Sequence, residues 1–331
     1  MVIIFQHKPS ILASAVSVGP LEKKSTFSPD FDVIYDDERW QEQTNEKGHM
    51  EMIKSTVELV MQKANIQPLD VDYSLSGDLV NQMTPTNIAA RELAIAFIGM
   101  FSACATSMSS LIIASALTDL GASRFSIAGA GSQHNAIERQ FRYPVDYGGQ
   151  KPATAQWTVT AAGYALVGEH HPNFPSIVAA TVGKVIDYGK TDPFHMGGAM
   201  APAACDTIMA HLKKRGQQFH HYDLIMTGDL GKIGLKLLKM LLTEAGVGKD
   251  ELTLLRDAGA EFYGEDPKFQ AGASGAGCSA SVYFSYVLNQ LKAGRYKRVL
   301  LVATGALLSP LTFQQGETIP CTAHAVEISM E

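Results

Sequence analysis

The feature that most constrains the fold of this chain is an internal repeat. Residues 72–79 read DYSLSGDL, and residues 223–230 read DLIMTGDL. Further along, three residues of the first half recur in the second half at one constant separation: Cys104 with Cys278, Arg124 with Arg298, and Gly131 with Gly305. Each half follows the order strand, helix, glycine- or alanine-rich turn, helix, strand. We therefore predict two similar halves, residues 1–175 and 176–331, packed as one body of the α/β class.

Composition and charge narrow the class of protein. The 331 residues are 46% hydrophobic and 18% charged, a globular balance that excludes a disordered or collagen-like chain. The formal net charge of −6 argues against a protein that grips nucleic acid by neutralising phosphates. Four cysteines are too few for a disulfide scaffold, so we expect reduced thiols in a cytosol-like compartment.

We expect neither a signal peptide nor a membrane span. The apolar start of the chain is interrupted by the polar residues 6–9, and the longest later apolar run, residues 111–117, is far shorter than the ~20 residues that span a bilayer. The expected chain is soluble, so contact with a membrane would come through a partner or a surface. Residues 22–49 are rich in charged residues and Gln, and are expected to form a surface excursion or an exposed helix.

Cys104 lies among small residues at the predicted start of a helix that ends near residue 120. The unpaired N–H groups and positive dipole at a helix start stabilise a thiolate, and they bind a carboxylate equally well. A small buried cysteine that only packs is the third interpretation, because Cys278 occupies the corresponding position in the second half. Position alone leaves all three open.

Longer motifs carry a resemblance to known proteins. Cys104 at its helix start, the duplicated halves, residues 160–167 (TAAGYALV) and residues 301–307 (LVATGAL) together resemble the thiolase and β-ketoacyl synthase superfamily. Within it, the stage V sporulation protein AD family of spore-forming bacteria is resembled by residues 132–144, 147–152, 199–204 and 303–310. The resemblance implies an α/β thiolase-like duplicated fold with α-β-α-β-α layering, and a homodimer.

The catalytic members of that superfamily pair the cysteine with His and Asn, or with two His, on loops of the second half. Where those partners are expected, this chain has Thr227, Gly228 and Asp229 on one loop and Ala273 or Ser274 on the other. Serine and threonine donate hydrogen bonds but are not bases near neutral pH. A loop carrying Cys321 and His324 could still bring an imidazole to the thiol, although a turn cysteine and a strand-end histidine are the simpler interpretation.

The resemblance therefore implies a binding protein without catalysis. Its ligand would be pyridine-2,6-dicarboxylic acid (dipicolinic acid), alone or with calcium, and its partners the membrane proteins of a sporulation channel that loads the forespore. A flat dianion needs cations, oriented donors and a surface for the ring. The candidate ligand-binding residues are Cys104, His134, Arg139, Arg142, Lys151, Thr227, Asp229, Ser274, Thr304 and Ser309.

Each candidate also has a structural interpretation. Arg139, Arg142 and Lys151 could form surface salt bridges, for which Glu138 is an available partner. Asp78 and Asp229 end matching strands, where they would cap the next segment or offer oxygens to calcium. We expect no cofactor, because residues 129–131 are too short for a dinucleotide motif, and no metal site from the Cys321 and His324 pair.

Two other functions stay open. The first is a working acyltransferase or condensing enzyme that uses Cys104 with His324 or His134 on an acyl thioester. The second is a scaffold for membrane channel proteins with a vestigial pocket.

Overall fold

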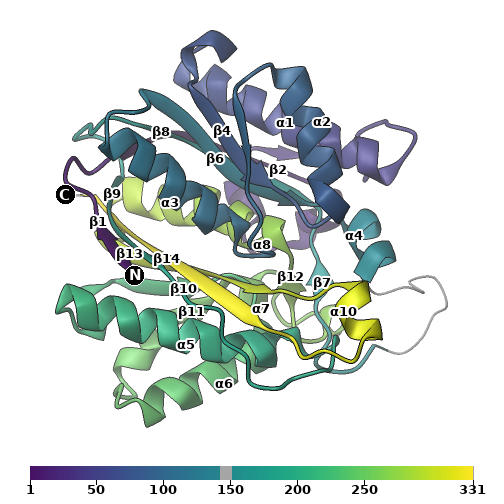
Figure 1. Cartoon of the computed structure of the whole chain (residues 1–331), viewed down its shortest axis with the longest axis vertical. Coiled ribbons are helices and arrows are strands. Elements are labelled where there is room, and N and C mark those ends of the chain that lie inside the picture. Colours follow the sequence, from purple (N-terminus) through teal and green to yellow (C-terminus); the bar gives the residue numbers. More distant parts are fainter. Residues whose placement is uncertain (142–150, 331) are drawn as a thin grey trace.

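The computed structural model describes residues 1–141 and 151–330, and within them it has an α/β architecture built from two matching sets of strands (Figure 1). The first set is β2 (Ser10–Val18), β4 (Tyr73–Gly77), β5 (Phe97–Gly99), β6 (Phe125–Ser132) and β8 (Ala161–Gly168). The second set is β9 (Ser176–Val182), β10 (Leu224–Thr227), β11 (Leu255–Asp257), β13 (Arg298–Ala306) and β14 (Cys321–Ser329).

The order of the strands is the same in both sets. The first set runs β5-β4-β6-β8-β2, and the second runs β11-β10-β13-β14-β9, so that strands of equal rank occupy equal places. The two sets meet where β2 and β9 pair at Ser10 and Ser176. The repeat in the sequence therefore corresponds to a repeat in topology, while the boundary at residue 175 stays a prediction.

Short strands complete the sheets. β1 (Val2–Ile4) pairs with β9, and β3 (Val33–Ile34) pairs with β2. β7 (Trp157–Thr158) and β12 (Ala273–Ser274) form a separate two-stranded ribbon that joins residues of the two halves.

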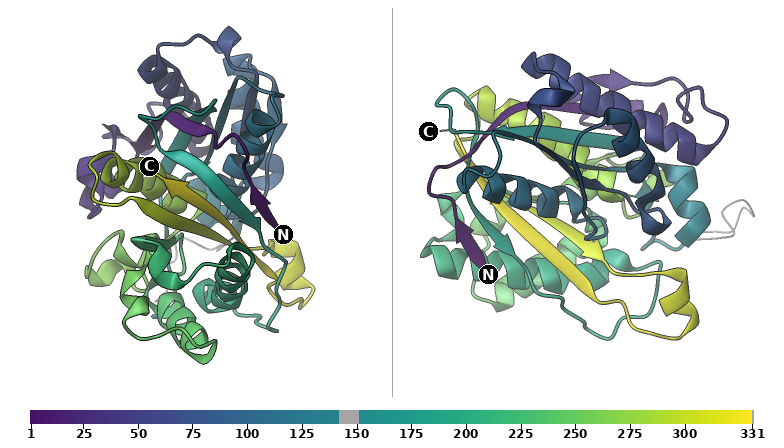
Figure 2. Two further views of the ribbon diagram at one scale, coloured as in Figure 1. Left: turned by 90° about the vertical axis from the view of Figure 1, so that its left-hand side faces the viewer. Right: turned by 45° about the horizontal axis from the view of Figure 1, so that its top comes forward.

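Helices form three layers around the sheets, as the side views show (Figure 2). One outer layer holds α1 (Asn45–Ala64) and α2 (Thr84–Leu93), and the other holds α5 (Met196–Arg215) and α6 (Gly231–Glu244). The central layer holds α3 (Thr106–Asp119) together with α8 (Ala276–Val282) and α9 (Leu288–Lys292). Shorter helices are α4 (His134–Phe141), α7 (Ala258–Glu261) and α10 (Pro310–Gln314). This layering confirms the predicted fold class.

The composition of α3 explains its central position. It contacts β4, β6 and β8 on one side and β13 and β14 on the other. Met108, Leu111 and Ile112 are buried, and so are the small residues Ser107 and Ala114. Most of α3 is buried, with Ile113 exposed, which suits the space between two sheets, and its small side chains let both sheets approach.

The segment 22–49 differs from the expectation of a surface excursion. Phe27, Phe31 and Trp40 are buried, Glu22 is only 1% exposed, and α1 begins within the segment at Asn45. The interspersed aromatic residues anchor the segment, which the high charge of the stretch conceals. In the described residues, no helix is both long enough and apolar enough to cross a membrane.

Candidate ligand-binding site

Cys104 lies in a tight turn between β5 and α3. Ala103 has a φ of 49°, a backbone conformation that costs a non-glycine residue about 1 kcal/mol or more. Thr106 holds the turn, because its Oγ1 accepts a hydrogen bond from the Ser102 N–H at 3.1 Å and donates one to the Ala103 carbonyl at 2.7 Å. The turn places the half-buried Cys104 immediately before the N-terminus of α3.

Cys104 opens onto a narrow pocket whose empty space, including the mouth, is about 570 Å³. The walls are largely apolar, and Phe101 at the mouth is 56% exposed. Residues of both halves line it: Leu79, Phe101, Ala103, Cys104, Ile137, Glu138, Phe141, Thr158, Pro193, Met196, Ser274, Gly275, Ala306 and Leu308. The structure therefore brings together two of the predicted site residues, Cys104 and Ser274.

Two residues of the pocket lining, Glu138 and Thr158, belong to a cluster of polar and aromatic side chains that extends behind the pocket wall. Glu138 is 1% exposed, and its Oε1 accepts a hydrogen bond from Thr158 Oγ1 at 2.8 Å. Its Oε2 lies 3.7 Å from the ammonium nitrogen of Lys151, which also lies 4.8 Å from the centre of the Trp157 ring. His134 stacks on Trp157 with 4.2 Å between ring centres, and its Nδ1 lies 2.8 Å from the Thr158 carbonyl oxygen. Burial lowers the pKa of His134, which favours the neutral imidazole.

Two donors in this cluster have no hydrogen-bond acceptor among the described residues. They are the Nζ of Lys151 and the Nε1 of Trp157, and both nitrogen atoms are buried. A buried donor without an acceptor costs about 1–3 kcal/mol. An anion that reached this cluster would supply the missing acceptors.

Loops of the second half meet at Asp229. Its Oδ1 accepts a hydrogen bond from Thr304 Oγ1 at 2.9 Å, and its Oδ2 accepts one from the Gly275 N–H at 3.0 Å. Asp229 is 1% exposed and does not line the pocket, but Gly275 and the adjacent Ser274 do. Asp229 and Thr304 therefore position the loop that forms one wall.

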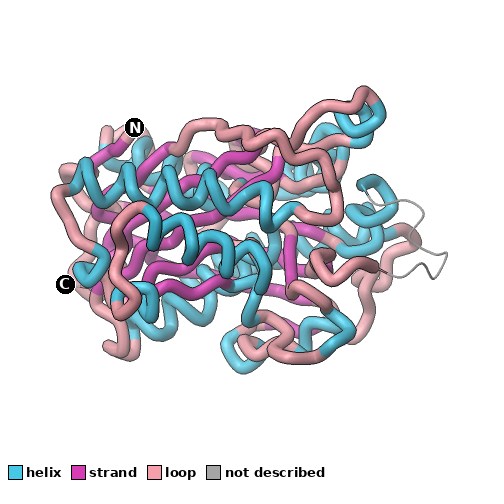
Figure 3. The backbone as a smooth tube through the Cα atoms, turned by 90° about the horizontal axis from the view of Figure 1, so that it is seen from below, coloured by secondary structure: helices cyan, strands magenta, loops and turns pink. Residues whose placement is uncertain are grey.

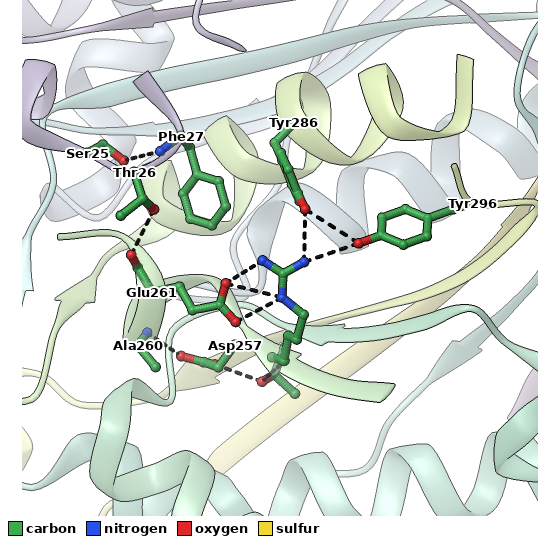
Figure 4. A network of polar contacts seen from close by, with 10 residues as sticks. Ser25, Thr26, Phe27, Asp257, Ala260, Glu261, Tyr286 and Tyr296 are labelled. Atoms are coloured by element: carbon green, nitrogen blue, oxygen red, sulfur yellow. Dashed lines mark hydrogen bonds and ion pairs between the residues drawn. The ribbon is translucent and has the colours of Figure 1, made fainter. Parts of the chain in front are cut away.

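Thr227 contacts Asp257 rather than the pocket, donating a hydrogen bond to Asp257 Oδ2 at 2.7 Å. The same carboxylate accepts the N–H groups of Leu230 and Gly231 at the start of α6, both at 2.9 Å. It also accepts the N–H of Ala260 at 2.7 Å (Figure 4). Burial raises the pKa of Asp257 to about 7, against hydrogen bonds that lower it. Thr227 thus helps to hold Asp257, whose carboxylate joins the starts of α6 and α7.

An arginine-centred network holds this region in place. The Arg256 guanidinium pairs with Glu261 and donates to the hydroxyl groups of Tyr286 and Tyr296 at 2.9 and 3.1 Å. Figure 4 shows Glu261 and the two tyrosines converging from separate elements. The network fixes the end of β11, and with it Asp257.

The two repeat-related cysteines have different surroundings. Cys278 is fully buried in α8, and its Sγ donates to the Gly228 carbonyl oxygen at 3.5 Å. Burial, together with the charges of Asp229 and Asp257, raises the pKa of the Cys278 thiol well above its usual value. Only Cys104 of this pair lines the pocket.

The alternative in which a loop carries His324 to the thiol is not what the structure shows. His324 lies within β14, opposite Ala303 and Val182 of the neighbouring strands, and its Nδ1 accepts the Gly183 N–H at 3.3 Å. Burial lowers its pKa to about 4. The chain enters β14 at Cys321 itself, so the strand fixes both residues.

Other predicted residues lie outside the pocket lining. Arg139 is exposed and pairs with Glu46 of α1. Ser309 caps α10, accepting the Thr312 N–H at 3.1 Å. Asp78 caps the segment before α2. Arg142 lies outside the described residues. In the part of the chain that is described, no three His, Cys, Asp or Glu side chains are grouped so as to hold a metal ion.

The sequence did not single out Thr158 or the buried Glu138 as pocket residues. Glu138 follows Ile137 and precedes Arg139 on a short helix, so it looks like one more surface charge. Thr158 gains its place in the pocket from the pairing of β7 with β12 and from its hydrogen bond to Glu138, neither of which one sequence reveals. Each depends on a contact between distant segments.

Comparison with solved structures identifies the class of fold. The structure is similar to 3-oxoacyl-[acyl-carrier-protein] synthase III from Aquifex aeolicus, with a TM-score of 0.59 and 13% identity over 97% of this chain and 99% of that one. It is also similar to a singly substituted form of OleA from Xanthomonas campestris, with a TM-score of 0.64 and 12% identity over 98% of this chain and 99% of that one. The fold is thus that of the thiolase-like condensing enzymes.

Sequence comparison defines the family. The family model for stage V sporulation protein AD (SpoVAD) matches residues 1–329. The Bacillus subtilis (strain 168) stage V sporulation protein AD is 44% identical over 325 residues, which cover 98% of this chain and 95% of that protein. The chain therefore belongs to the stage V sporulation protein AD family.

Proposed function

We propose that the protein binds dipicolinic acid, free or as its calcium complex, in the Cys104 pocket without converting it. In this role it would help to load the acid into the developing spore, as a homodimer at the inner membrane of the forespore, together with membrane proteins of the same sporulation channel. Membership of a sporulation family supports the setting.

The observation that carries the proposal is the pair of buried donors, Lys151 Nζ and Trp157 Nε1, beside an apolar pocket. A ligand carboxylate would accept hydrogen bonds from both, and a hydrogen bond from a charged donor contributes about 1.5–3 kcal/mol. The side chains of Phe101 and Phe141 offer apolar surface to a flat ring. The described lining contains a thiol, a carboxylate and hydroxyl groups but no imidazole, a set that suits binding better than acyl transfer.

Glu138 bears on the form of the ligand. Its carboxylate lines the pocket, and Lys151 at 3.7 Å balances its charge. A free dianion would be attracted by Lys151 but repelled by the Glu138 carboxylate beside it, whereas the calcium complex of the acid carries no net charge and avoids that repulsion. We therefore expect calcium to strengthen binding.

Calorimetric titration with dipicolinate, with and without calcium, tests the proposal. Lys151→Met is expected to weaken binding by roughly 10- to 100-fold, and Trp157→Phe, which removes the N–H but keeps a ring, by less. Arg139→Ala is the control, because Arg139 pairs with Glu46 outside the pocket and its loss should leave affinity unchanged. Absence of saturable binding by the native chain, or equal effects of Lys151→Met and Arg139→Ala, would refute it.

The apolar lining favours one alternative, an acyl thioester held at Cys104. The protein would then acquire an acyl group on Cys104 when incubated with acyl-CoA, which intact-mass and peptide mass spectrometry detect. We expect no adduct. An adduct on Cys104 that is absent from Cys104→Ala would replace the binding proposal with an acyltransferase.

A further inference from the structure

The outer face of α6 combines lysines with an exposed methionine, Met240, and the partly buried Leu235. Gly234, Leu238 and Leu242 are the buried residues that α6 turns toward α5 and the sheet. The opposite side forms a shallow hollow, about 660 Å³ with its mouth, lined by Lys232, Leu235, Lys236, Lys239, Met240 and Thr243. These six residues are called the α6 face below. Figure 3 shows the molecule from below relative to Figure 1, the side on which α6 forms the outermost layer.

The charge of the α6 face is largely uncompensated. Lys232 pairs with Glu265 at 2.9 Å, whereas no ion pair of Lys236 or Lys239 is formed within the described residues. The helix carries a single acidic residue, Glu244 at its end. The α6 face is therefore positively charged, although the chain as a whole has a net charge of −6.

Apolar surface continues from this face onto α5. Met240 is 52% exposed. The next residue, Leu241, lines a groove between α6 and α5 together with Met209, Tyr188 and the exposed Lys213. An exposed methionine beside partly buried leucines and between lysines, on a helix that lies along the outside of the protein, is a combination that can contact a bilayer surface.

We propose that the α6 face binds the surface of an anionic lipid bilayer, with α6 parallel to the membrane plane. Lysines near an anionic surface are attracted to it, and Met240 would enter the boundary between headgroups and acyl chains. The lysines supply the attraction to negative charge. The exposed Met240 favours a lipid surface over nucleic acid, because phosphate contacts alone give an apolar side chain no favourable environment. The site lies on a different element from the Cys104 pocket and does not depend on the ligand proposed there.

Vesicle flotation tests this directly. The full chain is mixed with phosphatidylcholine vesicles, with or without phosphatidylglycerol, at low and high salt. We expect binding only to the anionic vesicles, lost at high salt because the charges are exposed. Lys236→Glu/Lys239→Glu should weaken it by roughly 30-fold or more, and Met240→Ser by a smaller factor that persists across salt concentrations.

The matched control is Lys23→Glu/Lys24→Glu, which makes the same charge change at two exposed lysines of the first half. This control should retain most of the binding. Three outcomes would overturn the proposal. The protein could bind neutral and anionic vesicles equally, or both double variants could lose binding equally. It could also bind RNA or an acidic protein through these lysines without binding vesicles. Thermal unfolding of each variant confirms its fold, and dipicolinate titration of the same proteins separates failure of this surface from failure of the pocket.

Discussion

Replacing Gly305 by alanine tests whether the second half positions the turn that carries Cys104. Gly305 lies in β13, and a Cβ built on it would fall 2.4 Å from the Ser102 carbonyl oxygen and 3.2 Å from the Cβ of Ala103. Gly305 is not among the residues with a positive φ, so lack of space is the only obstacle to a side chain. The substitution thus probes one contact between the halves.

The internal repeat supplies a matched control at Gly131, the counterpart of Gly305. There a Cβ would first meet His49 Nε2 at 3.1 Å, which requires a shift of only a few tenths of an ångström. At Gly305 the obstacle is backbone, which must move by nearly 1 Å to reach an ordinary contact, so the cost should approach the upper end of the ~1–3 kcal/mol typical of overpacking. Both variants gain the same ~0.4–1 kcal/mol from the stiffer unfolded chain, so their difference isolates the packing cost.

Urea unfolding followed by circular dichroism measures this difference. We expect Gly305→Ala to be less stable than Gly131→Ala by about 1.5 kcal/mol or more. Because the displaced atoms belong to the turn before Cys104, the rate at which iodoacetamide alkylates Cys104 should also change in Gly305→Ala alone. Equal stabilities and equal alkylation rates would show that β13 does not hold this turn.

Two further predictions concern buried carboxylates. Burial alone would raise the pKa of Glu327, but hydrogen bonds from His211 and Arg215 lower it from 4.5 to about 2. The ionised carboxylate therefore contributes about 3 kcal/mol to the stability of the fold. This contribution is fully present above pH 4.5 and is lost as the pH falls toward 2. Glu327→Gln should therefore destabilise the protein at pH 6 and much less near pH 2.5 in urea unfolding; a penalty independent of pH contradicts this. Asp229→Ala should lower the free energy of unfolding by about 1–3 kcal/mol, because it leaves the Gly275 N–H without its acceptor. It should also weaken dipicolinate binding more than a core substitution that destabilises the protein equally. Equal loss of binding in both variants would contradict a positioning role for Asp229.

The repeat predicted two similar α/β halves, and the resemblance to a known family implied their thiolase-like layering. Local sequence also predicted the turn at Cys104, which lines the pocket, while its function stays a prediction. Small residues around Cys104 marked this turn as one that a ligand could approach. Charged side chains were harder to place. Arg139 and Lys151 look alike in sequence, yet Arg139 reaches Glu46 on a distant helix and Lys151 reaches the buried Glu138. Which cation faces a pocket depends on long-range packing that one sequence does not reveal.

The two halves differ at positions that the repeat relates to each other, and two of these differences lie at the candidate pocket. Asp78 accepts the Thr86 N–H at the start of α2, within the first half. Its counterpart Asp229 instead joins loops that form a pocket wall. Cys278 is sealed in the core, whereas Cys104 opens onto that pocket. The second half therefore supplies walls and support to a site centred on the first. A ligand bound in the pocket would contact residues of both halves, so its binding should raise the free energy of unfolding of the whole chain.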